Sequence, residues 1–133
     1  MNTNIIRYGM ILCGLVNIVA ILFFSMFFTN PSISKFQPEV MSNFGLFMII
    51  VWGLVFIAPA SKIEFVPNIL LAFAFEKLTY TSIWLLWWKD NFATFDFSFQ
   101  QDILSSGFQV LYGMNDFIWF IFFLWAYLKL RKG

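Results

Sequence analysis

The sequence FAFEKLTY at residues 73–80 places an acidic and a basic residue side by side in the middle of a long apolar run. The run extends from Val66 to Trp88, which is long enough, at ~1.5 Å per helical residue, to cross a hydrocarbon layer of ~30 Å. Glu76 and Lys77 lie close to its midpoint. A charge at this depth costs roughly 2.5–3.5 kcal/mol, so it indicates a functional site or a buried partner. The sequence therefore predicts a membrane protein with a polar centre.

The composition excludes most soluble and catalytic classes. Apolar residue types make up 61% of the 133 residues and charged types 11%, against about 45–50% and about 25% in ordinary soluble domains. The net charge of +1 gives no basic face for nucleic acid, so we expect none as a partner. The chain has no histidine and one cysteine, which excludes histidine-ligated metals and haem and a Ser-His-Asp triad. We expect no metal and no cofactor.

Four apolar runs predict four transmembrane helices in a single membrane domain. The predicted spans cover approximately residues 5–28, 44–60, 66–88 and 107–128. The expected fold class is all-α, a polytopic four-transmembrane-helix bundle in contact with the lipid bilayer.

Basic residues outside the runs predict the orientation. The terminal segments and the second loop carry most of them, namely Arg7, Lys62, Lys129, Arg131 and Lys132, whereas the first and third loops carry Lys35 and Lys89. By the positive-inside rule, both termini face the cytoplasm.

The start of the fourth span allows two interpretations. Ser105, Gln109, Tyr112 and Asp116 are spaced by four, three and four residues, so they form a polar stripe on one face of a continuous helix. The alternative is that residues 103–113 form an amphipathic interfacial helix that ends at Gly113. We favour the continuous span because the stripe is regular.

The first span carries small and polar residues on one narrow face. Gly9, Cys13 and Asn17 recur every four residues, and Ala20 follows three residues later. Such a face allows close approach of another helix in lipid.

Five polar residues are predicted at a similar depth near the membrane centre: Asn17, Glu76, Lys77, Asn115 and Asp116. One arrangement pairs Lys77 with Asp116 and Glu76 with Asn17. This midplane network could be purely architectural, since buried ion pairs can set helix register. It could also form the floor of a cavity for a small apolar or amphipathic ligand, or handle protons or ions together with the polar stripe.

Three segments resemble parts of small four-helix bacterial inner-membrane proteins of the DoxX-like and BphX-like groups, which are largely without assigned activity. They are NFGLFM at residues 43–48, FEKLTY at residues 75–80 and YGMNDF at residues 112–117. The resemblance implies a compact four-helix bundle in the inner (plasma) membrane and a membrane pocket, without a specific reaction. The sterol-isomerase-like four-helix domains are a more distant comparison, and the absence of histidine here argues against their chemistry.

Taken together, these patterns predict a non-enzymatic integral inner-membrane protein that packs with or assists a larger membrane complex or forms a homo-oligomer. The first alternative is a binding protein or isomerase-like enzyme for a lipid-soluble ligand, with Glu76 and Asp116 in its pocket. The second alternative is proton- or ion-coupled transport through the polar stripe.

Overall fold

Four α-helices make up most of residues 2–133, the part of the chain that the computed structural model describes, and no β-strand occurs among them. The prediction of an all-α fold is confirmed. The elements in chain order are α1 (Asn4–Phe24), η1 (Pro31–Ser34), α2 (Asn43–Ile57), η2 (Ala60–Phe65), α3 (Ile69–Asn91), η3 (Phe92–Thr94) and α4 (Ile103–Lys132). The η elements are short 3-10 helices.

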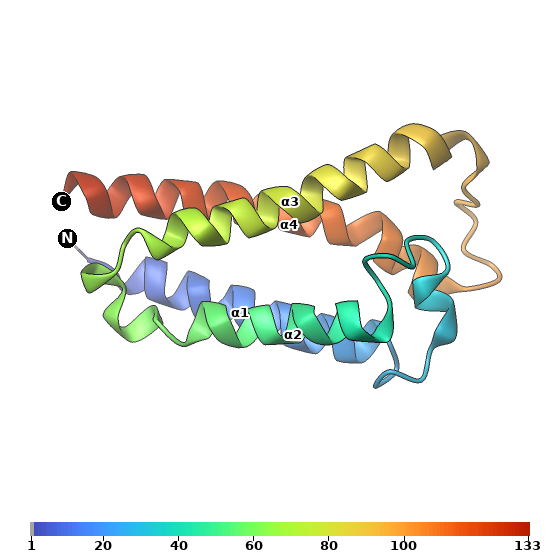
Figure 1. Ribbon diagram of the computed structural model, residues 1–133, viewed down its shortest axis with the longest axis horizontal. Helices are drawn as coiled ribbons and strands as arrows, with labels where there is room; N and C mark the ends of the chain where they lie inside the picture. The colour runs from blue at the N-terminus through green and yellow to red at the C-terminus, as the bar shows by residue number, and fades with distance from the viewer. Residues whose placement is uncertain (1) are drawn as a thin grey trace.

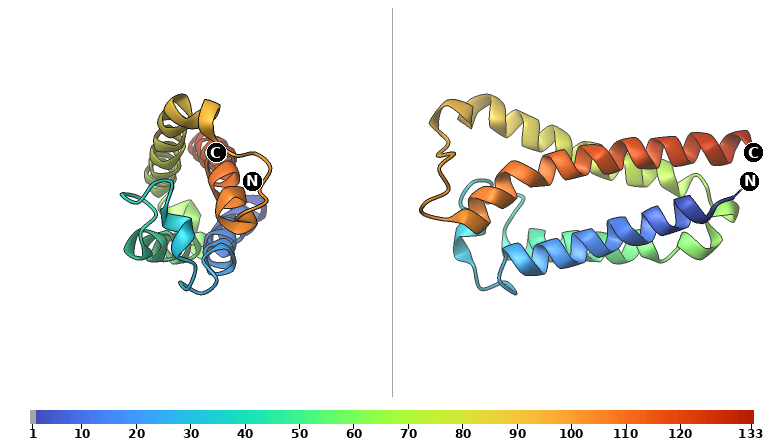
Figure 2. Two further views of the ribbon diagram at one scale, coloured as in Figure 1. Left: turned by 90° about the vertical axis from the view of Figure 1, so that its right-hand side faces the viewer. Right: turned by 180° about the vertical axis from the view of Figure 1, so that it is seen from behind.

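The α-helices run along the long axis of the molecule as two antiparallel pairs, α1 with α2 and α3 with α4 (Figure 1). Both termini lie at one end of the molecule, together with η2. The long connections after α1 and after α3 lie at the opposite end (Figure 2). We call this second end the loop end.

Three helices are long and apolar enough to cross a membrane: α1, α3 together with η3, and α4. With 15 residues, α2 covers only about 22 Å at ~1.5 Å per residue. Large apolar side chains lie on the outside of the helices, among them Phe44, Phe75 and Ile118. Soluble monomers rarely expose continuous apolar surface on this scale, so the outer surface is suited to contact with lipid.

The first helix is shorter than the span predicted over residues 5–28. It ends at Phe24, and Met26, Phe27 and Phe28 then adopt φ values of 51°, 55° and 66°. This left-handed conformation costs roughly 1–2 kcal/mol per non-glycine residue. The turn is stabilised by Ser25, whose Oγ accepts a hydrogen bond of 3.0 Å from the amide of Phe28.

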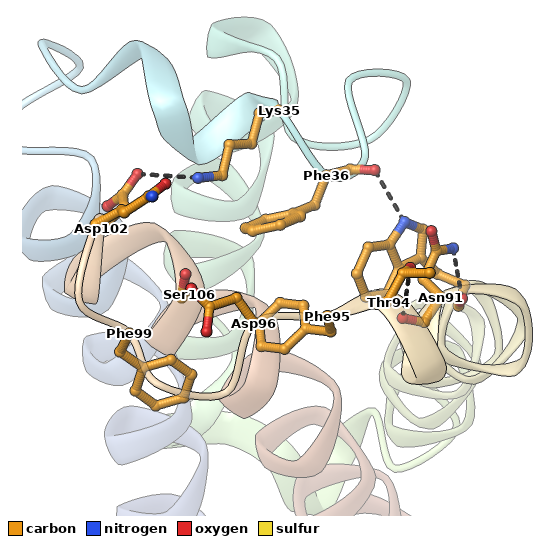
Figure 3. A pocket seen from close by; sticks show the side chains of 11 residues that line it. Lys35, Phe36, Asn91, Thr94, Phe95, Asp96, Phe99, Asp102 and Ser106 are labelled. Atoms are coloured by element: carbon orange, nitrogen blue, oxygen red, sulfur yellow. Dashed lines mark hydrogen bonds and ion pairs between the residues drawn. The ribbon is translucent and has the colours of Figure 1, made fainter.

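The fourth helix is continuous from Ile103 to Lys132, so it does not break at Gly113. It begins at Asp102, whose side chain accepts a hydrogen bond of 3.0 Å from the amide of Ser105 and thus caps the helix. Near the same point, Asp102 forms an ion pair of 3.5 Å with Lys35 of the first loop (Figure 3).

Glycines allow close contact within each helix pair. A β-carbon added to Gly14 of α1 would lie 2.4 Å from the carbonyl oxygen of Gly53 on α2. Similarly, a β-carbon on Gly113 of α4 would lie 2.0 Å from the indole of Trp84 on α3. Both distances are far below van der Waals contact, so each pair can pack this tightly only with glycine at these positions.

Two apolar clusters form the core. The cluster nearer the termini contains Met10, Phe56 and Phe123, among other residues, and the cluster nearer the loop end contains Ile21 and Phe108. Along α1, α3 and α4, the residues of the midplane network lie between these two clusters. The network therefore has an apolar cluster on its side toward the termini and another on its side toward the loop end.

Candidate ligand site in the centre of the helices

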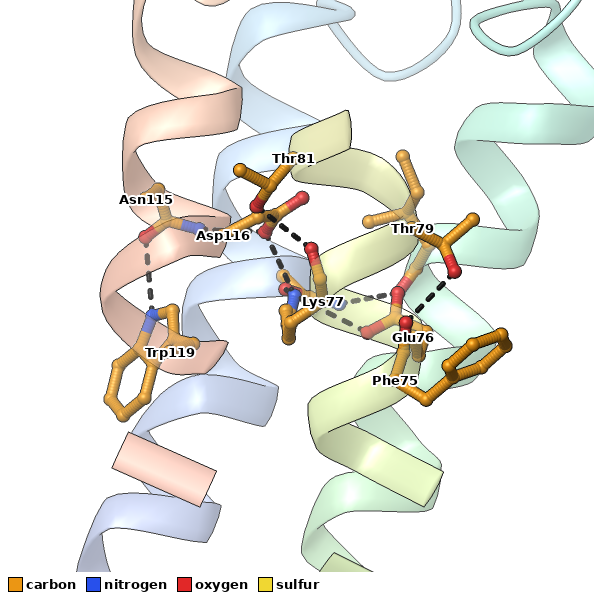
Figure 4. Close-up of polar contacts among 10 residues, drawn as sticks. Phe75, Glu76, Lys77, Thr79, Thr81, Asn115, Asp116 and Trp119 are labelled. Carbon is orange, nitrogen blue, oxygen red and sulfur yellow. Dashed lines mark hydrogen bonds and ion pairs between the residues drawn. The ribbon is translucent and has the colours of Figure 1, made fainter. Parts of the chain in front are cut away.

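The ammonium group of Lys77 is the centre of the polar network. Lys77 lies on α3 and is 1% exposed. Its Nζ donates hydrogen bonds to Asp116 Oδ1 on α4, at 2.9 Å, and to Asn17 Oδ1 on α1, at 3.1 Å (Figure 4). It also lies 5.0 Å from the centre of the Phe56 ring on α2, which is a favourable position for a cation.

Asn17 extends the network to the second helix. Its Nδ2 donates a hydrogen bond of 3.0 Å to the carbonyl oxygen of Ile49 on α2. Side chains around Lys77 therefore join all four helices at one level. Because an isolated buried charge is far more costly than a paired one, these contacts offset the cost of burying the ammonium group.

The structure pairs Lys77 with Asp116, as in the arrangement considered above, but it does not pair Glu76 with Asn17. The amide of Asn17 is already used by Lys77 and by Ile49. Glu76 Oε2 instead lies 3.8 Å from Lys77 Nζ, is buried, and has no hydrogen-bond partner within residues 2–133. Figure 4 shows Glu76 and Asp116 on different sides of the ammonium group. One ammonium group is thus shared by two carboxyl groups.

Asn115 contacts the same oxygen of Asp116 as Lys77 does. Its Nδ2 donates a hydrogen bond of 3.2 Å to Asp116 Oδ1, and its Oδ1 accepts one of 3.2 Å from the indole of Trp119. Asp116 Oδ1 therefore receives two donors, whereas Oδ2 accepts no hydrogen bond from the part of the chain that the structure describes. This free acceptor is the notable chemical feature of the network.

A groove of about 410 Å³ lies beside the network, between α1 and α4. Its walls are almost entirely apolar, and its polar lining consists of Asn17, Tyr112, Asn115 and Asp116. Glu76 is not among the residues that line this groove, so of the two carboxyl groups only that of Asp116 borders it. Asp116 lies on α4 and borders the groove. Glu76 and Lys77 are consecutive residues of α3, so their side chains point about 100° apart around the helix axis.

The polar stripe of α4 is buried, and its first three members bind residues of the loop after α1. Ser105 Oγ accepts a hydrogen bond of 3.2 Å from Asn30, and Gln109 Nε2 donates one of 3.0 Å to Gln37. Tyr112 also donates to Gln37. Within residues 2–133, no stripe residue hydrogen-bonds directly to the next one, and only Gln109 and Tyr112 are joined, through Gln37.

Gln37 and Asn30 also contribute to the polar contacts of α4, although no sequence pattern predicts this. Both come from the loop after α1, which folds back over the loop end of the helices. Gln37 is 5% exposed there although it stands between Phe36 and Pro38 in a stretch without periodicity. No local pattern marks it, because its burial depends on where the loop meets α4.

The small-residue face of α1 is used inside the molecule. Cys13 and Asn17 are buried, and a β-carbon on Gly9 would lie 2.1 Å from the ring of Phe122 on α4. Ala20 lines the groove together with Asn17. The face therefore supports packing within this chain.

The described residues include no group of three or more His, Cys, Asp or Glu side chains placed to hold a metal ion. Comparisons of the chain with protein-family models, with curated protein sequences and with solved structures found no match, so the geometry of the site is what bears on its function.

Proposed function

We propose that this chain is an integral membrane protein that binds an amphipathic, lipid-soluble molecule in the groove between α1 and α4. The single observation that carries this proposal is the position of Asp116, which lines an apolar groove while Lys77 and Asn115 hold one of its oxygens. The groove takes the apolar part of the ligand, and Asp116 takes its polar group.

The dimensions of the groove support this function. Ligand pockets commonly measure about 300–1,000 Å³ and have apolar walls with a few convergent polar groups, and the groove of about 410 Å³ falls in this range. Leu111, Met114 and Ile118, which line it, are each at least half exposed on the outside of α4. A ligand would therefore enter sideways from the hydrocarbon layer.

The charges at the groove define the polar group of the ligand. Asp116 Oδ2 is a free acceptor, so the matching ligand group is a hydrogen-bond donor. Two carboxyl groups share the one ammonium group of Lys77, so a protonated amine fits better than a neutral hydroxyl. Binding requires no bond to break, and the proposal includes no catalytic step.

The membrane placement is part of the same proposal: four spans in the inner (plasma) membrane of a bacterium, with both termini in the cytoplasm. Both termini and η2 lie at one end of the molecule, together with Arg7, Lys62 and the basic residues of the C-terminus. The short helix α2 is accommodated by local thinning of the bilayer. The likeness to DoxX-like and BphX-like proteins supports the bacterial inner membrane.

Cysteine labelling tests this placement. In a Cys13→Ala background, Ser98→Cys in the third loop should react with a membrane-impermeant maleimide added to whole spheroplasts. Ser61→Cys in the second loop should react only after lysis. The reverse pattern would show that the orientation is opposite.

Photolabelling tests the groove. The probe is a long-chain primary alkylamine that carries a diazirine, added to the full chain in detergent micelles, and its matched control is the corresponding alcohol. We expect the amine to label residues of α1 and α4. Ala20→Phe fills the groove from α1 while leaving every residue of the network in place, and it should reduce labelling about ten-fold, equivalent to about 1.4 kcal/mol of binding free energy.

Two further variants make this result specific. Ala72→Phe places the same ring on an exposed position of α3 outside the groove, and it should leave labelling unchanged. Asp116→Asn should reduce labelling by the amine more than labelling by the alcohol. If Ala20→Phe and Ala72→Phe are labelled equally, the groove is not a binding site.

The other two functions have less support. For assembly with a larger complex, the small-residue face of α1 offers little free surface, because Gly9 and Cys13 pack within the chain. Proton or ion transport requires a connected path. Gln37 joins Gln109 and Tyr112, but within residues 2–133 no hydrogen bond joins Ser105 to Gln109 or Tyr112 to Asp116.

A further inference from the structure

A second cavity, of about 240 Å³, lies at the loop end of the molecule (Figure 3). It is enclosed by the loop after α1, the end of α3 with the residues that follow it, and the beginning of α4. It shares no lining residue with the groove between α1 and α4. The two cavities can therefore be studied independently.

Three aromatic rings form a corner of this cavity. The ring centre of Phe36 lies 5.6 Å from that of Trp87 and 5.4 Å from that of Phe95, and the Trp87 and Phe95 rings are nearly perpendicular at 87°. Lys35 Nζ lies 4.8 Å from the centre of the Phe36 ring. All three aromatic residues line the cavity, and aromatic rings attract cations over their faces, as Lys35 over Phe36 shows.

Two carboxylates line the same cavity. Asp96 accepts hydrogen bonds from the hydroxyl and the amide of Ser98, which hold the pKa of Asp96 below its usual range. Burial acts to raise the pKa of Asp102, but hydrogen bonds from Ser105 and the nearby charge of Lys35 act together against it, and the pKa is lowered. Both carboxylates are therefore ionised at neutral pH, and with Lys35 they leave an excess of one negative charge.

The cavity also contains unused hydrogen-bond donors. Ser106 is 7% exposed and lines the cavity, and its hydroxyl has no hydrogen-bond partner among the residues that the structure describes. Lys35 is tied to Asp102 only by a contact of 3.5 Å, and its side chain remains nearly half exposed. A ligand with both an anionic and a cationic group would match this cavity. Its anionic group would accept hydrogen bonds from these donors, and its cationic group would balance the excess negative charge.

We infer that this cavity binds the headgroup of a zwitterionic phospholipid, with its ammonium group against the aromatic corner and Asp96, and its phosphate at Lys35 and Ser106. The cavity is smaller than the ~300 Å³ lower limit of typical ligand pockets, so it fits a headgroup with the acyl chains outside. Trp84, Trp87 and Trp88 lie at the same end of α3, and tryptophan gathers at headgroup depth. That this zwitterionic group belongs to a membrane lipid rests on the proposed membrane placement.

Equilibrium binding of short-chain lipids tests the inference. The full chain in detergent is titrated with dihexanoyl phosphatidylethanolamine, with dihexanoyl phosphatidylglycerol, and with glycerophosphoethanolamine, which has no acyl chains. Bound lipid is counted by native mass spectrometry. We expect the phosphatidylethanolamine to bind about five-fold or more tightly than the phosphatidylglycerol, because only its ammonium group can use the aromatic corner.

Matched variants assign the effect to the cavity. Asp96→Asn keeps the acceptor for Ser98 but removes the charge, and Phe95→Leu removes a ring; each should weaken phosphatidylethanolamine about three-fold or more. Asp90→Asn and Phe97→Leu, in the same region but outside the lining, should bind as the wild type does. Ser106→Ala should weaken both lipids, since both carry a phosphate.

Three outcomes would overturn the inference. Equal affinity for the two lipids would exclude recognition of the ammonium group. Wild-type affinity in both Asp96→Asn and Phe95→Leu would exclude this cavity as the site. Binding of glycerophosphoethanolamine as tightly as the lipid would identify a soluble phosphorylated amine as the ligand.

Discussion

The ammonium group of Lys77 on α3 lies 2.9 Å from Oδ1 of Asp116 on α4, and both residues are almost completely buried. Through Asn17 the same ammonium group is also joined to α1. The side chain of Lys77 therefore connects the two helix pairs at the level of the groove. Because its partner is Asp116, the residue that we propose binds the ligand, the stability of the helix packing and ligand binding depend on the same contact.

Lys77→Met should lower the free energy of unfolding by about 3–5 kcal/mol, because it leaves the buried carboxyl of Asp116 without its partner. Replacing the whole set, with Glu76→Gln, Lys77→Met and Asp116→Leu together, should recover most of this loss. Unfolding of the purified protein in mixed micelles with increasing SDS measures both effects. Lys62→Met, at an exposed position, is the control and should change stability by less than about 0.5 kcal/mol.

The triple variant also separates architecture from function. If it folds but no longer binds the alkylamine probe, the network has a binding role beyond stability. Unaltered labelling by the amine in the folded triple variant would contradict the role of Asp116 at the groove.

Gly113→Ala should destabilise the protein by about 1–3 kcal/mol, because the new methyl group would overlap the indole of Trp84. Gly107→Ala, on the same helix, is the matched control. A β-carbon there has its nearest neighbour at 3.9 Å, and alanine favours the helix by about 1 kcal/mol. Thermal unfolding in detergent should therefore show opposite shifts for the two variants, and equal shifts would contradict the close contact of α3 and α4.

Gln37→Leu should lower stability by about 1–3 kcal/mol, because Gln109 and Tyr112 would be left without their common acceptor. The loop after α1 should also become more sensitive to limited proteolysis. Gln100→Leu, at an exposed position of the third loop, provides the control. If the loop remains protease-resistant in Gln37→Leu, then apolar contacts such as those of Ile33 are sufficient to keep the loop in place without the hydrogen bonds of Gln37.

The stability contributed by the charge of Asp102 should depend on pH. Its pKa is lowered in the folded protein, so the folded state binds fewer protons than the unfolded state between the two pKa values. The contribution is therefore complete above the ordinary value of about 3.9 and is lost as the pH falls through the lower, folded value. Asp102→Asn keeps a capping side chain for α4 without the charge.

The difference in unfolding free energy between wild type and Asp102→Asn measures this contribution. It should be constant from pH 7 to about pH 5 and then decrease toward pH 3. A difference that grows on acidification would contradict the assigned sign.

Much of the fold follows from composition and spacing alone. Long apolar runs predict helices because only a helix satisfies its own backbone groups in apolar surroundings. The common depth of Asn17, Lys77 and Asp116 follows from counting residues along those helices, and the regular spacing of the stripe predicts the continuity of α4. These features depend on the local order of residues, which the sequence contains directly.

The partners within the network depend on three-dimensional packing. Whether Asn17 meets Lys77 or Glu76 is decided by the rotation of α1 and α3 about their axes, since neighbouring residues on a helix point about 100° apart. That rotation is set by distant contacts such as Gly14 against Gly53 and Gly113 against Trp84.

The structure of the loop end depends even more strongly on contacts between distant parts of the chain. The left-handed turn after Phe24 and the burial of Gln37 both depend on how the first loop meets α4, about 70 positions away in the chain. The apolar runs therefore determine which segments become helices, whereas the groove, its acceptor and the second cavity exist only where several distant segments come together.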